Sequence, residues 1–168
     1  MKPHQLLSTQ DLETRKATLF RCCGSTRWAD RMADSAPFSS RNDLHHVAIQ
    51  IWNSLEKEDY LEAFKAHPQI GASVEELRKK FQKTSDWSSG EQSGMQEASE
   101  ETIQSLKVAN AQYLDRFGYI FIVCATGKSA EEMLGIIQAR LPNDPETELL
   151  IAAKEQEKIT TIRLEKLL

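Results

Sequence analysis

The chain has 168 residues, a net charge of −4, 40% apolar residues and 27% charged residues. This length suits one domain over residues 1–168, with a core large enough to need no disulfide or structural metal. Lysine and arginine are spread along the chain, which argues against a nucleic-acid-binding surface. The longest apolar run, residues 119–125, is too short to span a bilayer, and the polar N-terminus has no apolar signal-peptide core. We therefore expect neither nucleic acid nor membrane as a partner.

Helical periodicity dominates the first half of the chain. A first helix carries Leu12 and Leu19 and ends at Gly24, a residue that tolerates the left-handed cap conformation. His4 is expected in a frayed N-terminus. A short helix around Trp28 precedes Pro37. The clearest helix follows the cap Ser40, with apolar residues at helical spacing. These are Leu44, Val47, Ala48, Ile51, Trp52 and Leu55.

The next predicted helices lead to the C-terminus. A short helix with Leu61 and Phe64 must end near His67, because Pro68 disfavours helix at the residue before it. Another helix begins at Ser73. The capping box Ser88–Glu91 predicts a long helix through Met95 and Tyr113 to Gly118. A second capping box, Ser129–Glu132, and the pair Asp144–Pro145 begin the last two helices.

Residues 119–125 interrupt this helical pattern. The sequence YIFIVCA reads locally as a buried strand, but no second strand of comparable strength is present to pair with it. Whether it is strand or loop stays open at this point. We therefore predict an all-α, single-domain helical bundle with one buried extended segment at about 119–125.

The three cysteines do not form a recognisable site. Cys22 and Cys23 are adjacent and Cys124 lies in the apolar run, so the spacing of zinc or redox C-x-x-C motifs is absent. We interpret them as reduced, partly buried thiols. His45 and His46 have no partner histidine at i+4, so a metal site is not expected.

Arg163 is the most informative residue on physical grounds alone. On a helical wheel, it falls among apolar residues of the last helix. These are Leu149, Ala152, Ala153, Ile159 and Leu167. A buried guanidinium cannot lose its proton and needs a carboxylate, supplied by the protein or by a ligand. The alternative is an arginine that reaches solvent or pairs with a structural acid.

His67 and Glu91 are further candidates, each with a structural alternative. His67 leaves a helix beside a rigid proline, a position suited to presenting its ring to a cleft, although a lone histidine is more often structural. Glu91 is the last member of a capping box, where glutamates commonly bond back to the cap backbone. The free N–H groups of that helix start could also bind an anionic or carbonyl-bearing ligand.

Four motifs in order resemble a known family. They are HPQIG at 67–71, SSGEQ at 88–92, FGYIFIVCATGKSAEEML at 117–134 and EQEKITTIRLEKL at 155–167. Each alone is weak, but together they resemble 2-oxo-4-hydroxy-4-carboxy-5-ureidoimidazoline (OHCU) decarboxylase, the third enzyme of urate breakdown to allantoin. The resemblance covers nearly the whole chain. It implies an all-α enzyme, usually a homodimer, with a small-molecule substrate and no metal or organic cofactor.

The resemblance also implies the site residues. The family's catalytic residues fall on His67, Glu91 and Arg163. The implied substrate contacts are these residues' neighbours and the extended segment: Pro68, Ser88, Ser89, Gly90, Glu91, Gln92, Phe121, Ile122, Val123, Cys124, Ala125 and Arg163. The backbone groups of the extended segment would hydrogen-bond a flat, amide-rich ligand.

The implied reaction is chemically coherent. Loss of carbon dioxide leaves a carbanion that the substrate's own carbonyl system can delocalise, and protonation on one face yields (S)-allantoin. The sequence does not tell whether His67 acts as base, acid or both. The rival hypothesis is a catalytically inactive helical interaction module, which should have lost one of the three catalytic residues. The C-terminal Lys166–Leu168 is not a peroxisomal signal, so a cytoplasmic location is expected.

Overall fold

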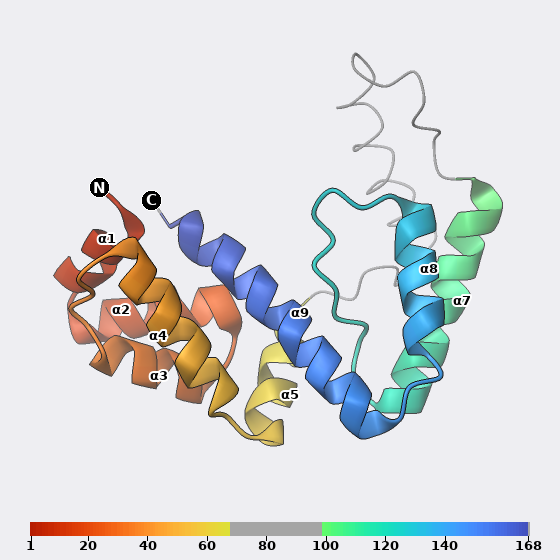
Figure 1. Cartoon of the computed structure of the whole chain (residues 1–168), viewed down its shortest axis with the longest axis horizontal. Helices are drawn as coiled ribbons and strands as arrows, with labels where there is room; N and C mark the ends of the chain where they lie inside the picture. The colour runs from red at the N-terminus through yellow and green to blue at the C-terminus, as the bar shows by residue number, and fades with distance from the viewer. Residues whose placement is uncertain (68–98, 168) are drawn as a thin grey trace, which may run out of the picture. The chain divides into compact units, whose positions relative to one another are not determined.

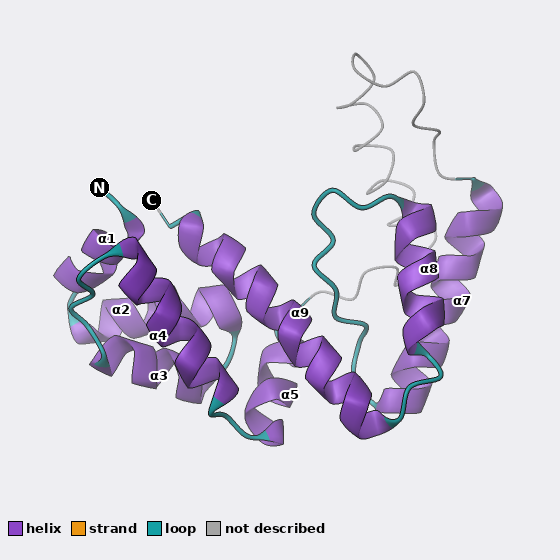
Figure 2. Cartoon of the chain, viewed as in Figure 1, coloured by secondary structure: helices purple, strands orange, loops and turns teal. Residues whose placement is uncertain are grey.

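The computed structural model describes residues 1–67 and 99–167. Every regular element in these two ranges is an α-helix (Figure 2), which confirms the all-α prediction. They divide into two compact units. Unit 1 comprises residues 1–67 and the chain from Ile151 onward; the described part of unit 2 is residues 99–150. The single-domain organisation of residues 1–168 stays a prediction.

Unit 1 contains five complete helices in its N-terminal part, grouped together in Figure 1. They are α1 (Pro3–Thr9), α2 (Leu12–Cys23), α3 (Thr26–Asp34), α4 (Arg41–Asn53) and α5 (Lys57–Lys65). Side-chain caps begin several of them: Ser40 accepts a hydrogen bond from the Asp43 N–H at 3.0 Å, as the sequence predicted for α4. The expected frayed N-terminus is wrong. Pro3 begins α1, and Leu7 anchors that helix in the core with no exposed surface.

Tryptophans connect the helices of unit 1. Trp28 is fully buried, and its indole N–H donates to the Ala48 carbonyl at 3.1 Å. The Trp52 indole N–H donates to the Ala153 carbonyl at 2.9 Å, which ties α4 to the C-terminal part of α9 (Pro145–Glu165). Because each indole buries a large apolar surface and satisfies its single donor, the first contact fixes α3 against α4 and the second fixes α9 against α4.

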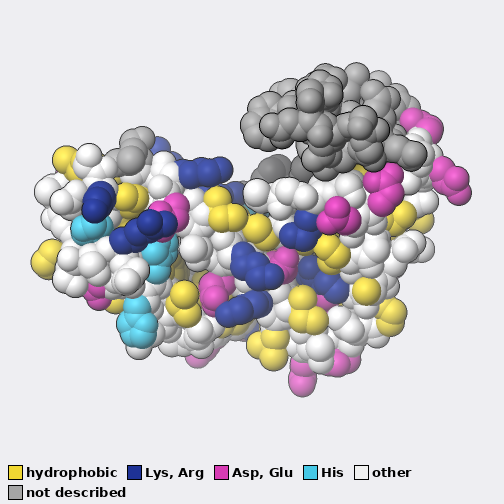
Figure 3. Space-filling model, turned by 45° about the horizontal axis from the view of Figure 1, so that its top comes forward, with side chains coloured by type: hydrophobic (Ala, Val, Ile, Leu, Met, Phe, Trp, Pro, Cys, Tyr) yellow, Lys and Arg dark blue, Asp and Glu magenta, His cyan; other side chains and the backbone are white. Residues whose placement is uncertain are grey.

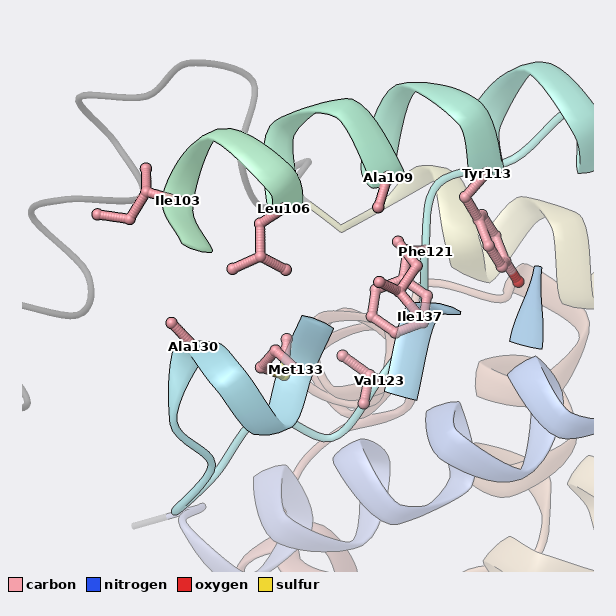
Figure 4. Close-up of a cluster of buried hydrophobic side chains, with 9 residues drawn as sticks. All are labelled: Ile103, Leu106, Ala109, Tyr113, Phe121, Val123, Ala130, Met133 and Ile137. Atoms are coloured by element: carbon pink, nitrogen blue, oxygen red, sulfur yellow. The ribbon is translucent and has the colours of Figure 1, made fainter. Parts of the chain in front are cut away.

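Unit 2 is built on α7 (Glu100–Phe117) and α8 (Ala130–Arg140), followed by the first turns of α9. Side chains from α7, α8 and the segment between them form one apolar cluster (Figure 4). Its members are Ile103, Leu106, Ala109, Tyr113, Phe121, Val123, Ala130, Met133 and Ile137. Ser129 begins α8 by accepting from the Glu132 N–H at 3.1 Å, as its capping box predicted.

The long helix of unit 2 begins later than the sequence indicated. Ser99 has an extended backbone and caps α7 by accepting from the Thr102 N–H at 3.1 Å, so the helix starts at Glu100. Two acidic residues in the first turn favour this start through the helix dipole. The Ser88–Glu91 box and the helix expected from Ser73 lie outside the described residues. The helix ends at Gly118, as predicted, and the φ of +80° there is the left-handed conformation that glycine tolerates.

The predicted buried extended segment is present. Phe121 to Cys124 are buried and Tyr119, Ile120 and Ala125 are half-buried, with no regular structure across 119–125. It is therefore a loop that crosses the core between α7 and α8, and not a strand. No helix within the described ranges is both long and apolar enough to cross a membrane.

Candidate active site

His67 lies two residues beyond α5, as the sequence predicted. Its backbone N–H donates to the Phe64 carbonyl at 3.2 Å, closing the last turn. Beneath it, α2 ends at Gly24 with φ +82°, where a Cβ atom would stand 2.6 Å from the Ala66 Cβ. Only glycine permits both this conformation and this approach, so the C-terminus of α2 sets the position of the chain that carries His67.

The His67 ring is half-buried and bonded to α9. Its Nε2 forms a short hydrogen bond with Oε1 of Gln156, a residue with 0% exposed surface. Burial lowers the pKa of His67, the nearby Arg163 charge lowers it further, and the Gln156 bond partly offsets both effects. The neutral imidazole is therefore the form present near pH 7, which leaves the ring able to accept a proton.

Arg163 lies beside this histidine in unit 1, half-buried rather than fully buried. Its Nη1 donates to the Cys22 carbonyl at 3.5 Å, and no carboxylate within the described residues forms an ion pair with it. The predicted apolar stripe was only partly right. Ala152 and Ala153 are buried, but Leu149, Ile159 and Leu167 are half-buried.

The buried face of α9 instead carries polar residues. Gln156 and Thr160 are buried, in line with Ala152 and Leu164 at four-residue spacing. Sequence reasoning missed both polar residues, although the same wheel places them on the inward side. Arg163 is half-buried beside this face, and its charge acts on His67.

The extended segment is held by basic side chains within unit 2. Arg140 Nη1 donates to the Ile122 carbonyl at 2.8 Å, and Lys128 Nζ donates to the Cys124 carbonyl at 2.6 Å. The Ala125 carbonyl accepts from the Lys128 backbone N–H at 3.1 Å. Three of the carbonyls expected to serve a ligand thus already have a donor. The prediction that Phe121 to Ala125 contact substrate stays a prediction. These bonds limit the backbone groups that could serve a ligand to the other N–H and C=O groups of the segment and to the unused lone pairs of the three carbonyls.

A buried charged network in unit 2 explains how this segment is anchored. Arg140 Nε donates to both carboxylate oxygens of Glu148, at 2.8 and 3.0 Å, and the Tyr113 hydroxyl donates to Glu148 at 3.0 Å. The Arg140 guanidinium also lies 4.6 Å from the centre of the Phe121 ring. Glu148 has no exposed surface, and sequence reasoning missed this network entirely.

The remaining predicted site residues cannot be placed. Pro68 and residues 88–92, which include the expected catalytic Glu91, lie outside the described residues. Of the expected catalytic set, the structure brings His67 and Arg163 together in unit 1. The segment from Phe121 to Ala125 belongs to unit 2.

The thiols agree with the sequence interpretation. All three cysteines are buried, and none is part of a disulfide. Burial raises the pKa of Cys22 to about 11 and that of Cys23 to about 12, so both are neutral thiols near pH 7. Within the described ranges, no group of three or more histidine, cysteine, aspartate or glutamate side chains is arranged to hold a metal ion.

A second polar region lies on the surface of unit 1, where Figure 3 shows histidine, basic and acidic side chains beside one another. Arg41 Nε donates to Glu165 at 2.6 Å, and the His45 ring forms a short hydrogen bond with the same carboxylate. These contacts border a hollow of about 470 Å³. Its lining residues are Lys2, Pro3, His4, Ser39, Ser40, Arg41, Asn42 and Glu165.

Two curated relatives share much of this sequence. The uric acid degradation bifunctional protein TTL of Arabidopsis thaliana is 40% identical over 148 residues, which is 87% of this chain and 45% of the relative. The uric acid degradation bifunctional protein PucL of Bacillus subtilis is 30% identical over 159 residues, 94% of this chain and 31% of the relative. The chain thus spans less than half the length of either relative.

A solved structure matches over nearly its whole length. It is described as OHCU decarboxylase in the presence of (S)-allantoin, with 36% identity and a TM-score of 0.73, covering 94% of this chain and 98% of that one. The family model for OHCU decarboxylase matches residues 8–165. The chain therefore belongs to the OHCU decarboxylase family.

Proposed function

We propose that this chain is a carboxy-lyase that converts 2-oxo-4-hydroxy-4-carboxy-5-ureidoimidazoline to (S)-allantoin in urate degradation, without a metal or organic cofactor. The observation that carries the proposal is the match to an OHCU decarboxylase solved in the presence of (S)-allantoin, which extends over 98% of that chain. In unit 1, a neutral histidine beside an arginine without a described carboxylate partner supports the same reading.

In this proposal the reaction begins with the substrate carboxylate held in line for departure. As carbon dioxide leaves, the electron pair of the breaking carbon–carbon bond moves into the substrate's imidazolone system, so no electron sink is required from the protein. A proton must then reach the carbanion carbon from one face. His67, half-buried and with its pKa lowered, is suited to exchange that proton or the proton of the neighbouring hydroxyl.

Arg163 is proposed to grip a substrate oxygen with its planar donor fork. Its contact among the described residues is one long hydrogen bond to the Cys22 carbonyl, so most of its five N–H donors meet no acceptor in that part of the chain. Glu91 is proposed to accept hydrogen bonds from ureido or ring N–H groups and so fix the pose. Its assignment rests on the SSGEQ motif alone.

We also propose a homodimer in the cytoplasm. The family resemblance supports the homodimer, and three buried thiols outside any disulfide fit a reducing compartment. Analytical ultracentrifugation of the purified chain tests the first point, since a single species of about one chain's mass, 19.1 kDa, would contradict it.

Optical activity is the direct test of the reaction. Substrate is generated freshly from urate, and circular dichroism is followed after the chain is added, because protonation without a chiral site can occur on either face and gives no net signal. We expect a rapid signal of one sign with the wild type and only the slow background with His67→Asn. A wild-type trace that matches the background would contradict the proposal and favour the inactive interaction module.

A chelator arm tests the cofactor prediction separately. Dialysis against a strong chelator, followed by the same assay, is expected to leave turnover unchanged. A large loss that one divalent metal restores would show that the reaction needs that metal.

A further inference from the structure

A line of buried polar groups runs behind His67 along α9. Gln156 has no exposed surface and Thr160 is 6% exposed, so both polar side chains lie in the core. Buried polar side chains destabilise a fold unless they are hydrogen-bonded to one another. Here they are hydrogen-bonded: Gln156 bonds His67 on one side and Thr160 on the other.

The hydrogen bonds in this line have one direction. Nε2 of Gln156 donates to the Thr160 hydroxyl at 3.0 Å. The amide oxygen Oε1 therefore faces Nε2 of His67. An amide oxygen can only accept, so Nε2 of His67 must carry the ring proton. In the neutral ring, Nδ1 is then the atom with the free lone pair.

We infer that Gln156 is a positioning residue that holds neutral His67 in the Nε2–H tautomer, so that Nδ1 is the atom that exchanges a proton with the substrate. The second clause rests on the proposed function, whereas the first concerns the protein alone. No hydrogen bond joins Nδ1 to any residue in the described ranges. When Nδ1 takes a proton, the bond from Nε2–H to the Gln156 oxygen stabilises the resulting imidazolium.

The charges around His67 keep its imidazole ring neutral near pH 7. Arg163, on the same helix as Gln156, is the charged group that acts on His67 within the described part of the chain, and it disfavours the imidazolium. The thiols of Cys22 and Cys23 on α2 carry no charge near pH 7. A neutral amide at position 156 therefore orients the ring without forcing it into the cationic form, which a carboxylate there would do.

The test is the tautomer and pKa of His67, measured by two-bond ¹⁵N–¹H NMR correlation on the full chain without substrate. The four histidines are assigned by comparison with His67→Asn. In the wild type we expect neutral His67 to be protonated on Nε2. Gln156→Met keeps the side-chain length but removes the acceptor, so the tautomer preference should be lost and the pKa should fall. Gln156→Glu should keep the tautomer and raise the pKa above that of the wild type.

Two further variants keep the test decisive if Gln156→Met does not fold. Thr160→Val removes the far anchor of Gln156, so it should shift the His67 tautomer in the same direction but less. Thr161→Val is the matched control, because the Thr161 hydroxyl bonds the Glu157 carbonyl at 3.0 Å and not Gln156. The His45 signal, from a ring bonded to Glu165, should not move in any of these variants.

Turnover completes the experiment. We expect Gln156→Met to lower kcat by about 10–100-fold with little change in KM, as for partners that orient metal-bound histidines. A neutral wild-type His67 protonated on Nδ1, or a folded Gln156→Met with wild-type tautomer and pKa, would overturn the inference. The expected NMR shifts in a chain without decarboxylase activity would instead overturn the proposed function and leave the tautomer assignment standing.

Discussion

Two arginines, one in each unit, use the same side chain for different purposes. Arg140 in unit 2 is 6% exposed, and its N–H groups donate hydrogen bonds to Glu148, the Ile122 carbonyl and the Tyr113 hydroxyl. Arg163 in unit 1 is half-buried and donates one 3.5 Å bond to the Cys22 carbonyl. A guanidinium whose donors are satisfied by the protein stabilises the fold, whereas one with donors left over can bind a ligand.

Helix α9 contributes to both arrangements. Its first turns supply Glu148 to the closed network of unit 2, and its later turns supply Gln156 and Arg163 beside His67 in unit 1. The closed network makes a buried ion pair that is expensive to disrupt. In the open arrangement, Nδ1 of His67 and most Arg163 donors have no partner among residues 1–67 and 99–167. The two arginines therefore differ more in how many of their N–H donors have acceptors among the described residues than in their burial. This difference separates the structural arginine from the proposed catalytic one.

The largest expected effect comes from breaking the closed network. Arg140→Met leaves the fully buried Glu148 carboxylate without its cation, so the free energy of unfolding should fall by about 3–5 kcal/mol. Urea denaturation measures this loss. In the control Arg140→Met/Glu148→Leu, neither charge is left unpaired, and much of the stability should return. A loss below about 1 kcal/mol in the single variant would show that water reaches this pair.

A loss of activity with unchanged stability is expected from His67→Asn. Asparagine can hydrogen-bond Gln156 but cannot exchange a proton near pH 7, so kcat should fall by about 10²–10⁴-fold. The melting temperature should stay near that of the wild type, because His67 is half-buried and lies outside the helices. Near-wild-type turnover of a well-folded variant would reduce His67 to a structural residue.

Arg163→Lys tests the open arginine directly. Lysine keeps the charge but offers one compact ammonium in place of a planar fork, so kcat/KM should fall by some tens to thousands of fold, equivalent to roughly 2–5 kcal/mol. The melting temperature should change little, because the native contact replaced is one long hydrogen bond. A much lower melting temperature with normal activity in the folded fraction would make Arg163 a structural residue like Arg140.

The smallest effect is expected at the surface cluster of unit 1. Arg41 lowers the pKa of Glu165 below its ordinary value of 4.5, with help from His45. A lowered folded-state pKa means that this stabilisation is present above pH 4.5 and is lost as pH falls through the lower value. Glu165→Gln should therefore cost less than about 1 kcal/mol at neutral pH and nothing well below pH 4. Thermal melts across this pH range measure the difference, and an effect that grows on acidification would contradict the assignment.

Local sequence signals predicted much of the fold. Caps at Ser40, Ser129 and Gly118 begin or end helices where expected, because capping depends on a few neighbouring residues. The start of α7 was wrong because the prediction took the Ser88–Glu91 box as the cap, whereas Ser99, followed by two acidic residues, begins the described helix. The helix α1 was missed because its single buried anchor, Leu7, carries no periodic signal.

The sequence predicted residues of the candidate site but not the residues that hold them in position. Four ordered motifs pointed to His67 and Arg163, and the wheel correctly brought Arg163 toward the core side of its helix. Neither source indicated Gln156 or Arg140, since a glutamine or arginine in a helix is usually solvated. Their roles depend on partners 89 residues away in one case and 8 and 18 residues away in the other.

By itself, the sequence determined the helical class, most helix ends and the family to which the chain belongs. It also led us to expect reduced thiols. These properties follow from patterns that neighbouring residues or ordered motifs contain. Only the tertiary structure decided which polar groups are satisfied: Arg140 by Glu148, the Gln156 amide by His67 and Thr160. Hydrogen-bond direction and burial arise where distant segments meet, so the tautomer of His67 and the open donors of Arg163 are properties of the fold.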